Sequence, residues 1–316
     1  MRPLLLLSLA LVLALPVNAQ TAGTRIREMA VTFDDLPFVN ARPTSVAEHQ
    51  RLTAALVGAI TRHRVPAVGF VNESKLEDGG RVDPRRVELL RQWMRANLEL
   101  GNHTYSHLDL HRVTASEFRD DIVRGDPVTR QLLAEIGRTP RFFRHPFLHT
   151  GRDTAIQRDV RGFLENRGYR VAPVTIDNSD YIFARAYDLA IAAGDTVLER
   201  RVRQEYLGYM DRVLTYYEKQ SITLIGRNIP HVLLLHANTL NADAFDALAT
   251  AYKKRGYGFV TLEHALLDAA YASPDGYVGN AGITWLHRWA LTQGRRGAVF
   301  AGEPEVPKWI ERAAEG

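Results

Sequence analysis

Two carboxylates, Asp34 and Asp35, stand side by side after a short apolar run at residues 29–33 and just before Pro37. The run predicts a buried strand, and the proline favours an end to it there. Because successive residues of a strand point to opposite faces, the two carboxylates can do different work. One can bind a metal ion while the other transfers a proton. The ordinary alternative is a solvated turn, which aspartate favours.

Two histidines, His103 and His107, are four residues apart. This spacing predicts that both imidazoles lie on one face of a helical turn, where they can bind one metal ion together. A carboxylate from Asp34 or Asp35 would complete a set of two histidines and one carboxylate, which leaves coordination positions open for catalysis. We therefore expect one divalent metal ion. Zinc is the ion that this ligand set favours, although affinity order alone does not decide the metal in a cell.

Further polar residues follow other apolar runs. Arg144 comes directly after Phe142 and Phe143. It would lie at the same end of the sheet as Asp34 and Asp35, where it could orient a carboxylate with two parallel hydrogen bonds. Residues 177–181 end the next predicted strand with polar groups and a tyrosine. His236 ends an apolar strand, where an imidazole can serve as a general acid. Taken singly, Arg144 would be a surface ion pair and His236 a capped structural histidine.

Strands and helices are expected to alternate along the chain. Strands are predicted at residues 29–33, 66–71, 98–102, 141–144, 169–176, 231–236 and 258–261. Helices are predicted at residues 46–63, 83–97, 159–167, 196–219, 244–255 and 262–271, with another after Thr114 that Pro127 interrupts. Capping boxes at Ser45/Glu48 and Thr114/Glu117 mark two of the helix starts. This alternation predicts an α/β architecture with a mainly parallel sheet or barrel.

Composition limits the function classes. With 316 residues, of which 46% are hydrophobic, the chain can bury a substantial core, and global disorder is excluded. The formal charge of +4 is small for this length, and the basic run at residues 200–203 indicates a solvated helix face. We therefore expect no nucleic-acid partner. The sequence does not predict an oligomeric state.

The first residues have the features of an export signal. Arg2 precedes an apolar stretch at residues 4–15, which is too short for a comfortable membrane span, and small residues stand at Val17 and Ala19. We expect a signal peptide at residues 1–19, with an uncleaved anchor as the alternative. After cleavage we expect no stable membrane insertion and a periplasmic or secreted protein. The absence of cysteine excludes disulfides and a lipoprotein anchor.

Several motifs together resemble those of the polysaccharide deacetylase family, the NodB-homology group called carbohydrate esterase family 4. In chain order they are residues 32–35 (TFDD), 103–107 (HTYSH), 143–146 (FRHP), an aspartate-containing loop at 177–181, and 234–236 (LLH). The resemblance implies a distorted (β/α) barrel and metal-dependent removal of acetyl groups from N-acetylated or O-acetylated sugars of a polysaccharide or oligosaccharide. It places a catalytic domain at residues 26–272 and leaves residues 273–316, with three of the four tryptophans, as a C-terminal extension that packs on it.

The resemblance also implies roles for the proton-transfer residues. It makes Asp34 the general base, oriented by Arg144. It makes His236 the general acid, which protonates the leaving amine. Either Asp177 or Asp180 would tune that acid.

The resemblance likewise implies a metal site and a substrate pocket. The metal ligands would be Asp35, His103 and His107. The substrate pocket would be lined by Leu234, Pro146 and Tyr181. The additional histidines His111, His145 and His149 are expected to support these groups or to lie at the surface.

Some residues depart from the family pattern and leave the substrate open. His145 stands where many relatives have a small residue or proline, residues 147–148 replace a Tyr-Gly pair, and Tyr181 replaces a tryptophan. An amidase acting on non-sugar C–N bonds therefore remains an alternative. A catalytically inactive carbohydrate-binding protein is a second one. The presence of every expected metal ligand and of both proton-transfer residues argues against the inactive protein.

Overall fold

The computed structural model describes residues 27–315. The predicted signal peptide, residue 26 of the predicted catalytic domain and Gly316 lie outside the described residues. Within residues 27–315, no helix is both long enough and apolar enough to cross a membrane.

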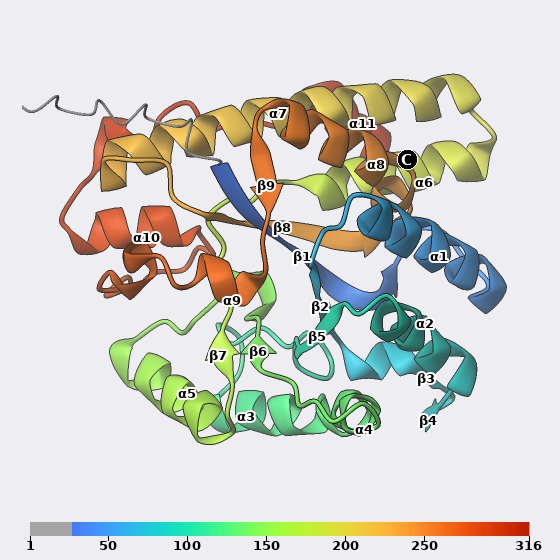
Figure 1. The fold of residues 1–316 in the computed structure, drawn as a ribbon, viewed down its shortest axis with the longest axis horizontal. Coiled ribbons are helices and arrows are strands. Elements are labelled where there is room, and N and C mark those ends of the chain that lie inside the picture. Colours follow the sequence, from blue (N-terminus) through green and yellow to red (C-terminus); the bar gives the residue numbers. More distant parts are fainter. Residues whose placement is uncertain (1–26, 316) are drawn as a thin grey trace, which may run out of the picture.

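Parallel strands form the centre of the molecule (Figure 1). The main sheet has seven strands in the order β7-β6-β5-β2-β1-β8, with β9 also paired to β1. Its strands are β1 (Arg27–Val39), β2 (Val68–Val71), β5 (Glu99–Asn102), β6 (Phe142–Phe143), β7 (Arg170–Val171), β8 (His231–Asn238) and β9 (Tyr257–Phe259). A separate antiparallel pair consists of β3 (Glu77–Asp78) and β4 (Arg81–Val82). Because β1 lies between β2 and β8, the carboxylates that follow Phe33 are near the middle of the sheet.

The sheet curls until its two ends meet. Residues that follow β7 reach β8, and Ile176 forms a parallel bridge with Leu233. The backbone N–H groups of Thr175 and Ile176 both lie 3.0 Å from the Val232 carbonyl, to which they donate. The predicted strand at 169–176 is therefore regular only over Arg170–Val171, since its remainder leaves β6 and joins β8. The result is the predicted distorted (β/α) barrel.

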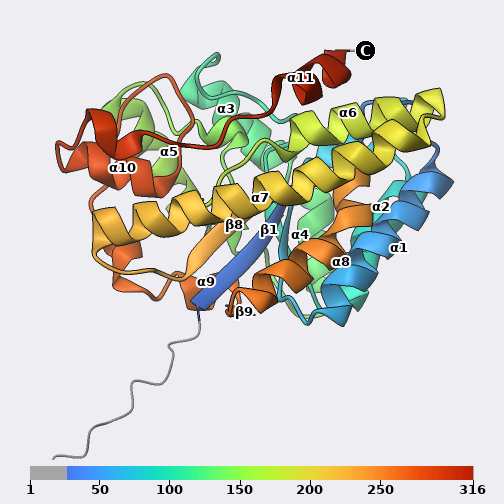
Figure 2. The same cartoon turned by 90° about the horizontal axis from the view of Figure 1, so that it is seen from above.

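Helices cover the outside of the curled sheet (Figures 1 and 2). They are α1 (Val46–Arg62), α2 (Pro84–Arg95), α3 (Ala115–Arg124), α4 (Pro127–Ala134), α5 (Thr154–Asn166), α6 (Asp180–Ala193), α7 (Thr196–Ile225), α8 (Thr239–Lys254), α9 (Leu262–Ala265), α10 (Trp285–Thr292) and α11 (Lys308–Glu315). α6 packs against both α7 and α8, and α11 packs on α6. The layer beside β8 is therefore two helices deep.

Local signals account for several helix ends. Thr114 and Glu117 form the predicted capping box at the start of α3. At α1 the Ser45 side chain accepts a hydrogen bond from the Glu48 N–H, as an N-cap residue does. Pro127 occupies the first turn of α4, where its missing N–H is not needed.

The helix α6 was not predicted, and neither were α10 and α11 of the C-terminal extension. α6 begins at Asp180, inside residues 177–181, which the sequence indicated only as a polar strand end. The Ser179 side chain makes no capping hydrogen bond, so the usual local signal for a helix start is missing. The helix ends at Gly194, whose φ of 69° is readily adopted by glycine.

The core is built around β1. Met29, Val31 and Phe33 are buried, and the Phe33 ring makes edge-to-face contacts with Trp93 at 5.5 Å and Phe245 at 5.4 Å between ring centroids. These two partners belong to α2 and α8, so β1 is clamped between helices that lie far apart in the sequence. The position of the carboxylates after Phe33 is fixed by this packing.

The C-terminal extension packs on the barrel. Trp285 and Trp289 of α10 are buried, and the Trp285 N–H donates to the Val174 carbonyl at 2.7 Å. Further along, Ile310 of α11 is fully buried, and the Arg185 Nε of α6 donates to the Ala314 carbonyl at 2.5 Å. The extension is thus held at both of its helices.

Candidate active site

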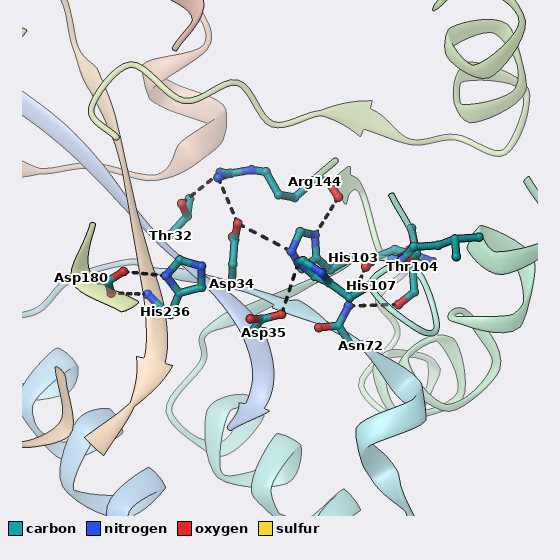
Figure 3. A network of polar contacts seen from close by, with 12 residues as sticks. Thr32, Asp34, Asp35, Asn72, His103, Thr104, His107, Arg144, Asp180 and His236 are labelled. Carbon is teal, nitrogen blue, oxygen red and sulfur yellow. Dashed lines mark hydrogen bonds and ion pairs between the residues drawn. The ribbon is translucent and has the colours of Figure 1, made fainter. Parts of the chain in front are cut away.

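A cavity of about 850 Å³ lies at the carboxyl ends of β1 and β8. It brings together the predicted groups from several elements: Asp34 and Asp35 from β1, His103 and His107 from the loop after β5, and His236 from β8. Figure 3 shows these side chains converging on one another. The site is thus made by residues that lie far apart in the sequence but share one end of a parallel sheet.

Asp35, His103 and His107 form the predicted three-residue group. One ligand atom from each lies within 4.8 Å of the ligand atoms of the others, and His107 Nε2 is 3.7 Å from Asp35 Oδ1. His103 Nδ1 lies 2.8 Å from the Arg144 carbonyl. A carbonyl can only accept, so Nδ1 carries the proton and the Nε2 lone pair is free for a ligand. This arrangement orients one histidine before any ion binds.

The backbone that carries the two histidines is not the predicted helical turn. Residues 103–107 form an irregular loop in which Thr104 has φ 63° and His107 has φ 58°. Asn72 Nδ2 donates to the His103 carbonyl at 2.6 Å, and Asn102 Oδ1 accepts from the Thr104 N–H at 2.8 Å. Left-handed φ is unfavourable for a β-branched residue such as threonine, so these buried amides must hold the loop in place. Tertiary hydrogen bonds, not helical periodicity, bring the imidazoles together.

The donor set fits a divalent metal ion. Burial alone would raise the pKa of Asp35, but the positive charges of Lys75 and His107 outweigh it and hold that pKa well below its usual range. Burial lowers the pKa of both His103 and His107, which favours neutral imidazoles. Asp35 Oδ1 is buried and accepts no hydrogen bond, although Lys75 Nζ lies 3.0 Å away. An ionised carboxylate and two neutral imidazoles are suitable ligands for zinc and similar ions.

Asp34 lies in a different environment from its neighbour. It is buried, and this burial raises its pKa to about 6 against the opposing charge of Arg144. Arg144 Nη1 lies 3.5 Å from Asp34 Oδ2, while Nη2 donates to Thr32 Oγ1 at 3.0 Å. The predicted bidentate contact is therefore wrong: the guanidinium divides its donors between a carboxylate and a hydroxyl. A carboxyl group with a pKa near neutrality is suited to accept a proton.

His236 forms a close pair with Asp180. Its Nδ1 donates to Asp180 Oδ1 at 2.6 Å, and its backbone N–H donates to Oδ2 at 2.8 Å. Asn241 Nδ2 donates to the same Oδ2 at 2.7 Å. Burial would lower the pKa of His236, but the Asp180 carboxylate outweighs it and raises that pKa to about 9. Asp180 is therefore the partner of His236, and Asp177 makes no hydrogen bond to it among the described residues.

Residues 21–171 match the family described as polysaccharide deacetylase. The resemblance to the polysaccharide deacetylase family is thus confirmed over residues 21–171.

Curated relatives match the chain over less than half of its length. It is 28% identical over 157 residues to a chitin deacetylase of Colletotrichum lindemuthianum, which is 48% of this chain and 52% of the relative. It is 29% identical over 126 residues to a chitooligosaccharide deacetylase of Bradyrhizobium sp. (strain ANU 289), which is 40% of this chain and 48% of the relative. The chain thus spans about half the length of the curated relatives it matches.

A solved structure confirms the predicted fold. The chitin deacetylase of the fungal pathogen Colletotrichum lindemuthianum superposes with a TM-score of 0.51 and 20% identity. The match covers 81% of this chain and 92% of that one. At this identity the likeness shows the barrel and not the activity.

Two of the three residues predicted for the substrate pocket line the cavity. Leu234 and Tyr181 line the cavity, and Tyr181 is 58% exposed with its ring centroid 6.1 Å from that of His236. Pro146 is buried and does not line the cavity. Its neighbour Phe147 does, 54% exposed, with its ring 4.5 Å from that of His107. Two exposed aromatic rings therefore flank the predicted metal ligands and the predicted acid.

Sequence reasoning missed the lining residues that come from distant elements. Tyr209 of α7 and the segment Glu303, Pro304 and Glu305 before α11 line the same cavity. The unusual length of the chain between Asp180 and His231 was a signal for the helix that carries Tyr209. Nothing in the sequence indicated that the extension would reach the site.

A second group of metal-binding residue types lies beside the cavity. Asp109, His111 and His149 also place one ligand atom each within 4.8 Å of the others. His149 Nδ1 lies 2.7 Å from Asp109 Oδ1, and the His149 ring stacks on His111 at 3.9 Å with planes 8° apart. Imidazole lone pairs lie in the ring plane, so two parallel stacked rings do not point at one ion. This group is a hydrogen-bonded stack that supports the pocket wall.

Proposed function

We propose that the protein is an exported, metal-dependent deacetylase that removes acetyl groups from N-acetylated amino sugars of a polysaccharide or oligosaccharide. The observation that carries the proposal is the arrangement of Asp34 and His236 in the cavity that also contains the three metal ligands. The related proteins act on chitin and chitooligosaccharides, which supports an N-acetylglucosamine unit as substrate.

Hydrolysis of an acetamide needs a stronger electrophile, a base for water and an acid for the amine. A divalent ion held by Asp35, His103 and His107, for which we propose zinc, would polarise the acetyl carbonyl and make water a better nucleophile. Asp34 accepts the proton that water loses as its oxygen bonds to the carbonyl carbon. When the C–N bond breaks, His236 donates a proton to the nitrogen, and acetate and a free amine result.

The charges around the two proton-transfer residues suit these roles. Arg144 and Thr32 are buried beside Asp34 and limit its movement, so the base is already aligned when water arrives. His236 has a pKa of about 9, so it is mostly protonated at neutral pH. An amine leaves poorly unless it is protonated, and His236 supplies this proton from a site fixed by Asp180.

Two features of the cavity support a sugar over another amide substrate. Phe147 and Tyr181 each expose more than half of their side chains at the cavity. Exposed aromatic faces can pack against the apolar C–H faces of a sugar ring. The expected signal peptide supports a location where acetylated glycans occur, in the periplasm or outside the cell.

Acetate release tests this proposal. The protein is stripped with a chelator, reloaded with zinc or left stripped, and incubated with acetylated oligosaccharides and with simple non-sugar acetamides. We expect acetate from N-acetylglucosamine oligomers with the reloaded protein and a loss of this activity after chelation. Acetate from the non-sugar amides alone would indicate an amidase. A protein that binds no metal and releases no acetate from any substrate would contradict the proposal.

A further inference from the structure

One wall of the cavity is formed by a short stretch of backbone in an unfavourable conformation. Phe147 has φ 57° and Leu148 has φ 55°, so two consecutive residues with large side chains adopt the left-handed region. Such a backbone persists only where its surroundings hold it. The Leu148 N–H donates to the His145 carbonyl at 3.1 Å, and the His149 N–H donates to the Pro146 carbonyl at 3.0 Å. Neither bond involves the Phe147 carbonyl, so further support for this residue must come from elsewhere.

The C-terminal extension contacts this stretch at Gly282. A Cβ atom at Gly282 would lie 1.7 Å from the Phe147 carbonyl oxygen and 3.2 Å from Leu148 Cβ. The first distance is far shorter than any van der Waals contact, so the two backbones touch and only glycine fits between them. Gly282 also lines the cavity. The backbone of the extension is therefore the surface against which Phe147 rests.

The segment that carries Gly282 is anchored on both sides. Before it, Tyr277 Oη donates to the Ala281 carbonyl at 3.1 Å. After it, the buried Trp285 donates its backbone N–H to the Val174 carbonyl at 2.7 Å. A side chain at position 282 would therefore displace the opposing backbone and not the extension.

The position of the Phe147 backbone determines where its ring lies. The ring is 54% exposed and lines the cavity. Its centroid is 4.5 Å from that of His107, with planes 73° apart, and 5.7 Å from that of His149, with planes 38° apart. The ring thus covers one predicted metal ligand and presents its exposed part to the cavity. A shift of the backbone at position 147 would move the ring away from both histidines.

We propose that Gly282 is a positioning residue, which holds Phe147 so that its ring packs against the sugar bound in the cavity. The inference rests on the proposed function for its choice of ligand. Gly282 lies outside residues 21–171, the part of the chain that matches the deacetylase family. The C-terminal extension therefore contributes to substrate binding through a backbone contact, although none of the proposed catalytic residues lies in it.

The Gly282→Ala variant tests this role by kinetics. We expect KM for the N-acetylglucosamine tetramer to rise about threefold to tenfold, the usual effect of losing one aromatic contact, while kcat changes less. Phe147→Ala should raise KM by a similar factor. In the Phe147→Ala background, Gly282→Ala should raise KM no further, because the ring that it positions is already absent. Two independent effects that multiply in the double variant would overturn the inference.

Gly276→Ala is the matched control in the same extension. A Cβ atom at Gly276 would lie 3.4 Å from Thr292 Cγ2, which is an ordinary contact. KM should therefore stay within about twofold of wild type. A rise in KM as large as that of Gly282→Ala would show a general effect of the extension and would contradict a specific role for Gly282.

A measurement without substrate separates this inference from the proposed function. The metal-free protein is labelled at histidine, and the NMR signals of His107 are assigned by their absence in His107→Gln. The Phe147 ring current shifts these signals, because the two ring centroids are only 4.5 Å apart. Phe147→Ala should remove the ring-current shift, Gly282→Ala should move the signals in the same direction, and Gly276→Ala should leave them in place. Unchanged His107 signals in Gly282→Ala would overturn the inference.

A milder variant covers the case in which Gly282→Ala does not fold. Tyr277→Phe removes the hydrogen bond to the Ala281 carbonyl, so it loosens the same segment. It should move the His107 signals towards their position in Phe147→Ala, and signals that stay in place would contradict the inference. If no sugar releases acetate but the His107 signals move, the proposed function fails and the placement of Phe147 by Gly282 stands. If the tetramer is hydrolysed with the same KM by every variant, the inference fails alone.

Discussion

Asp34 and Asp35 are adjacent in the sequence, yet their carboxyl groups lie in opposite electrostatic environments. Burial raises the pKa of Asp34 to about 6, while Lys75 and His107 outweigh burial at Asp35 and lower its pKa. The left-handed backbone of Asp35, with φ 70°, places its side chain towards His107. A metal ligand must be ionised, whereas a general base must accept a proton near the working pH. The surroundings therefore support the proposed division of roles.

The Asp34→Asn variant tests this division. The amide cannot accept a proton from water, so we expect kcat to fall by about 10²-fold to 10⁴-fold, the usual contribution of a general base. Zinc stoichiometry should stay at the wild-type value, because the metal ligands are unchanged. Activity is measured as acetate release, and zinc by elemental analysis of the dialysed protein. The matched variant Asp35→Asn should lose zinc as well as activity, and a fully active Asp34→Asn protein would exclude the base role.

The pair of His236 and Asp180 predicts the alkaline limb of the pH profile. The proposed acid acts only when protonated, so kcat should fall as pH rises through about 9, the pKa of His236. The Asp180 carboxylate raises that pKa, so Asp180→Asn should move the limb to lower pH. The measurement is kcat across pH 6 to 10 for both proteins, and Asp246→Asn, at an exposed position of α8, serves as the control. An unchanged limb in Asp180→Asn would show that another group supplies the proton.

At the scale of elements, the loop that follows β5 positions two of the three proposed metal ligands, His103 and His107. The spacing of four residues between His103 and His107 predicted that these two histidines would meet. The predicted helical turn was wrong, because a spacing of four residues fits a helical turn and also fits a loop that is held by hydrogen bonds from other parts of the chain. The left-handed residues Thr104 and His107 depend on hydrogen bonds from Asn72 and Asn102, and such tertiary contacts leave no periodic pattern.

The Asn72→Ala variant tests this external support. Removing the amide leaves the buried His103 carbonyl without its hydrogen bond at 2.6 Å, which costs about 1–3 kcal/mol of stability. Zinc affinity should fall by about 10-fold or more, the usual effect of losing a group that orients a metal ligand. Stability is measured by urea unfolding of the metal-free protein, and affinity by competition with a chelator. Asn166→Ala, at an exposed helix end, should change neither quantity.

The strands could be predicted from the sequence, whereas α6 and the path of the C-terminal extension could not. The positions of the strands could be predicted, because apolar runs such as that of β8 end in polar residues at one edge of the sheet. α6 was missed, since Ser179 makes no side-chain cap and Asp180 points to His236. The position of Glu303 in the cavity wall could not be predicted either. It depends on how the extension packs against α7, which is a matter of three-dimensional contact.

At the scale of the whole molecule, the C-terminal helix supports the catalytic end of α6. α11 packs on the helix that begins with Asp180, and Figure 2 shows the two helices on the same side of the barrel. Ile310 is fully buried in this contact region. Ile310→Ala should therefore lower the free energy of unfolding by about 2–5 kcal/mol. Urea unfolding measures this change, and Ile222→Ala, at a side chain 55% exposed, should stay within about 0.5 kcal/mol of wild type.

The central position of β1 also determines when the site can exist. β1 pairs in parallel with β8, so the first described strand gains this partner only after a strand much later in the chain has been synthesised. Until β8 arrives, one edge of an apolar strand lacks its partner, and an unpaired edge of this kind is a template for aggregation. Contacts between such distant segments also form slowly. The proposed proton donor His236 lies on β8 itself, so a chain in which β8 is not yet paired has neither a closed barrel nor the proposed acid. The pairing that completes the sheet therefore also completes the proposed active site.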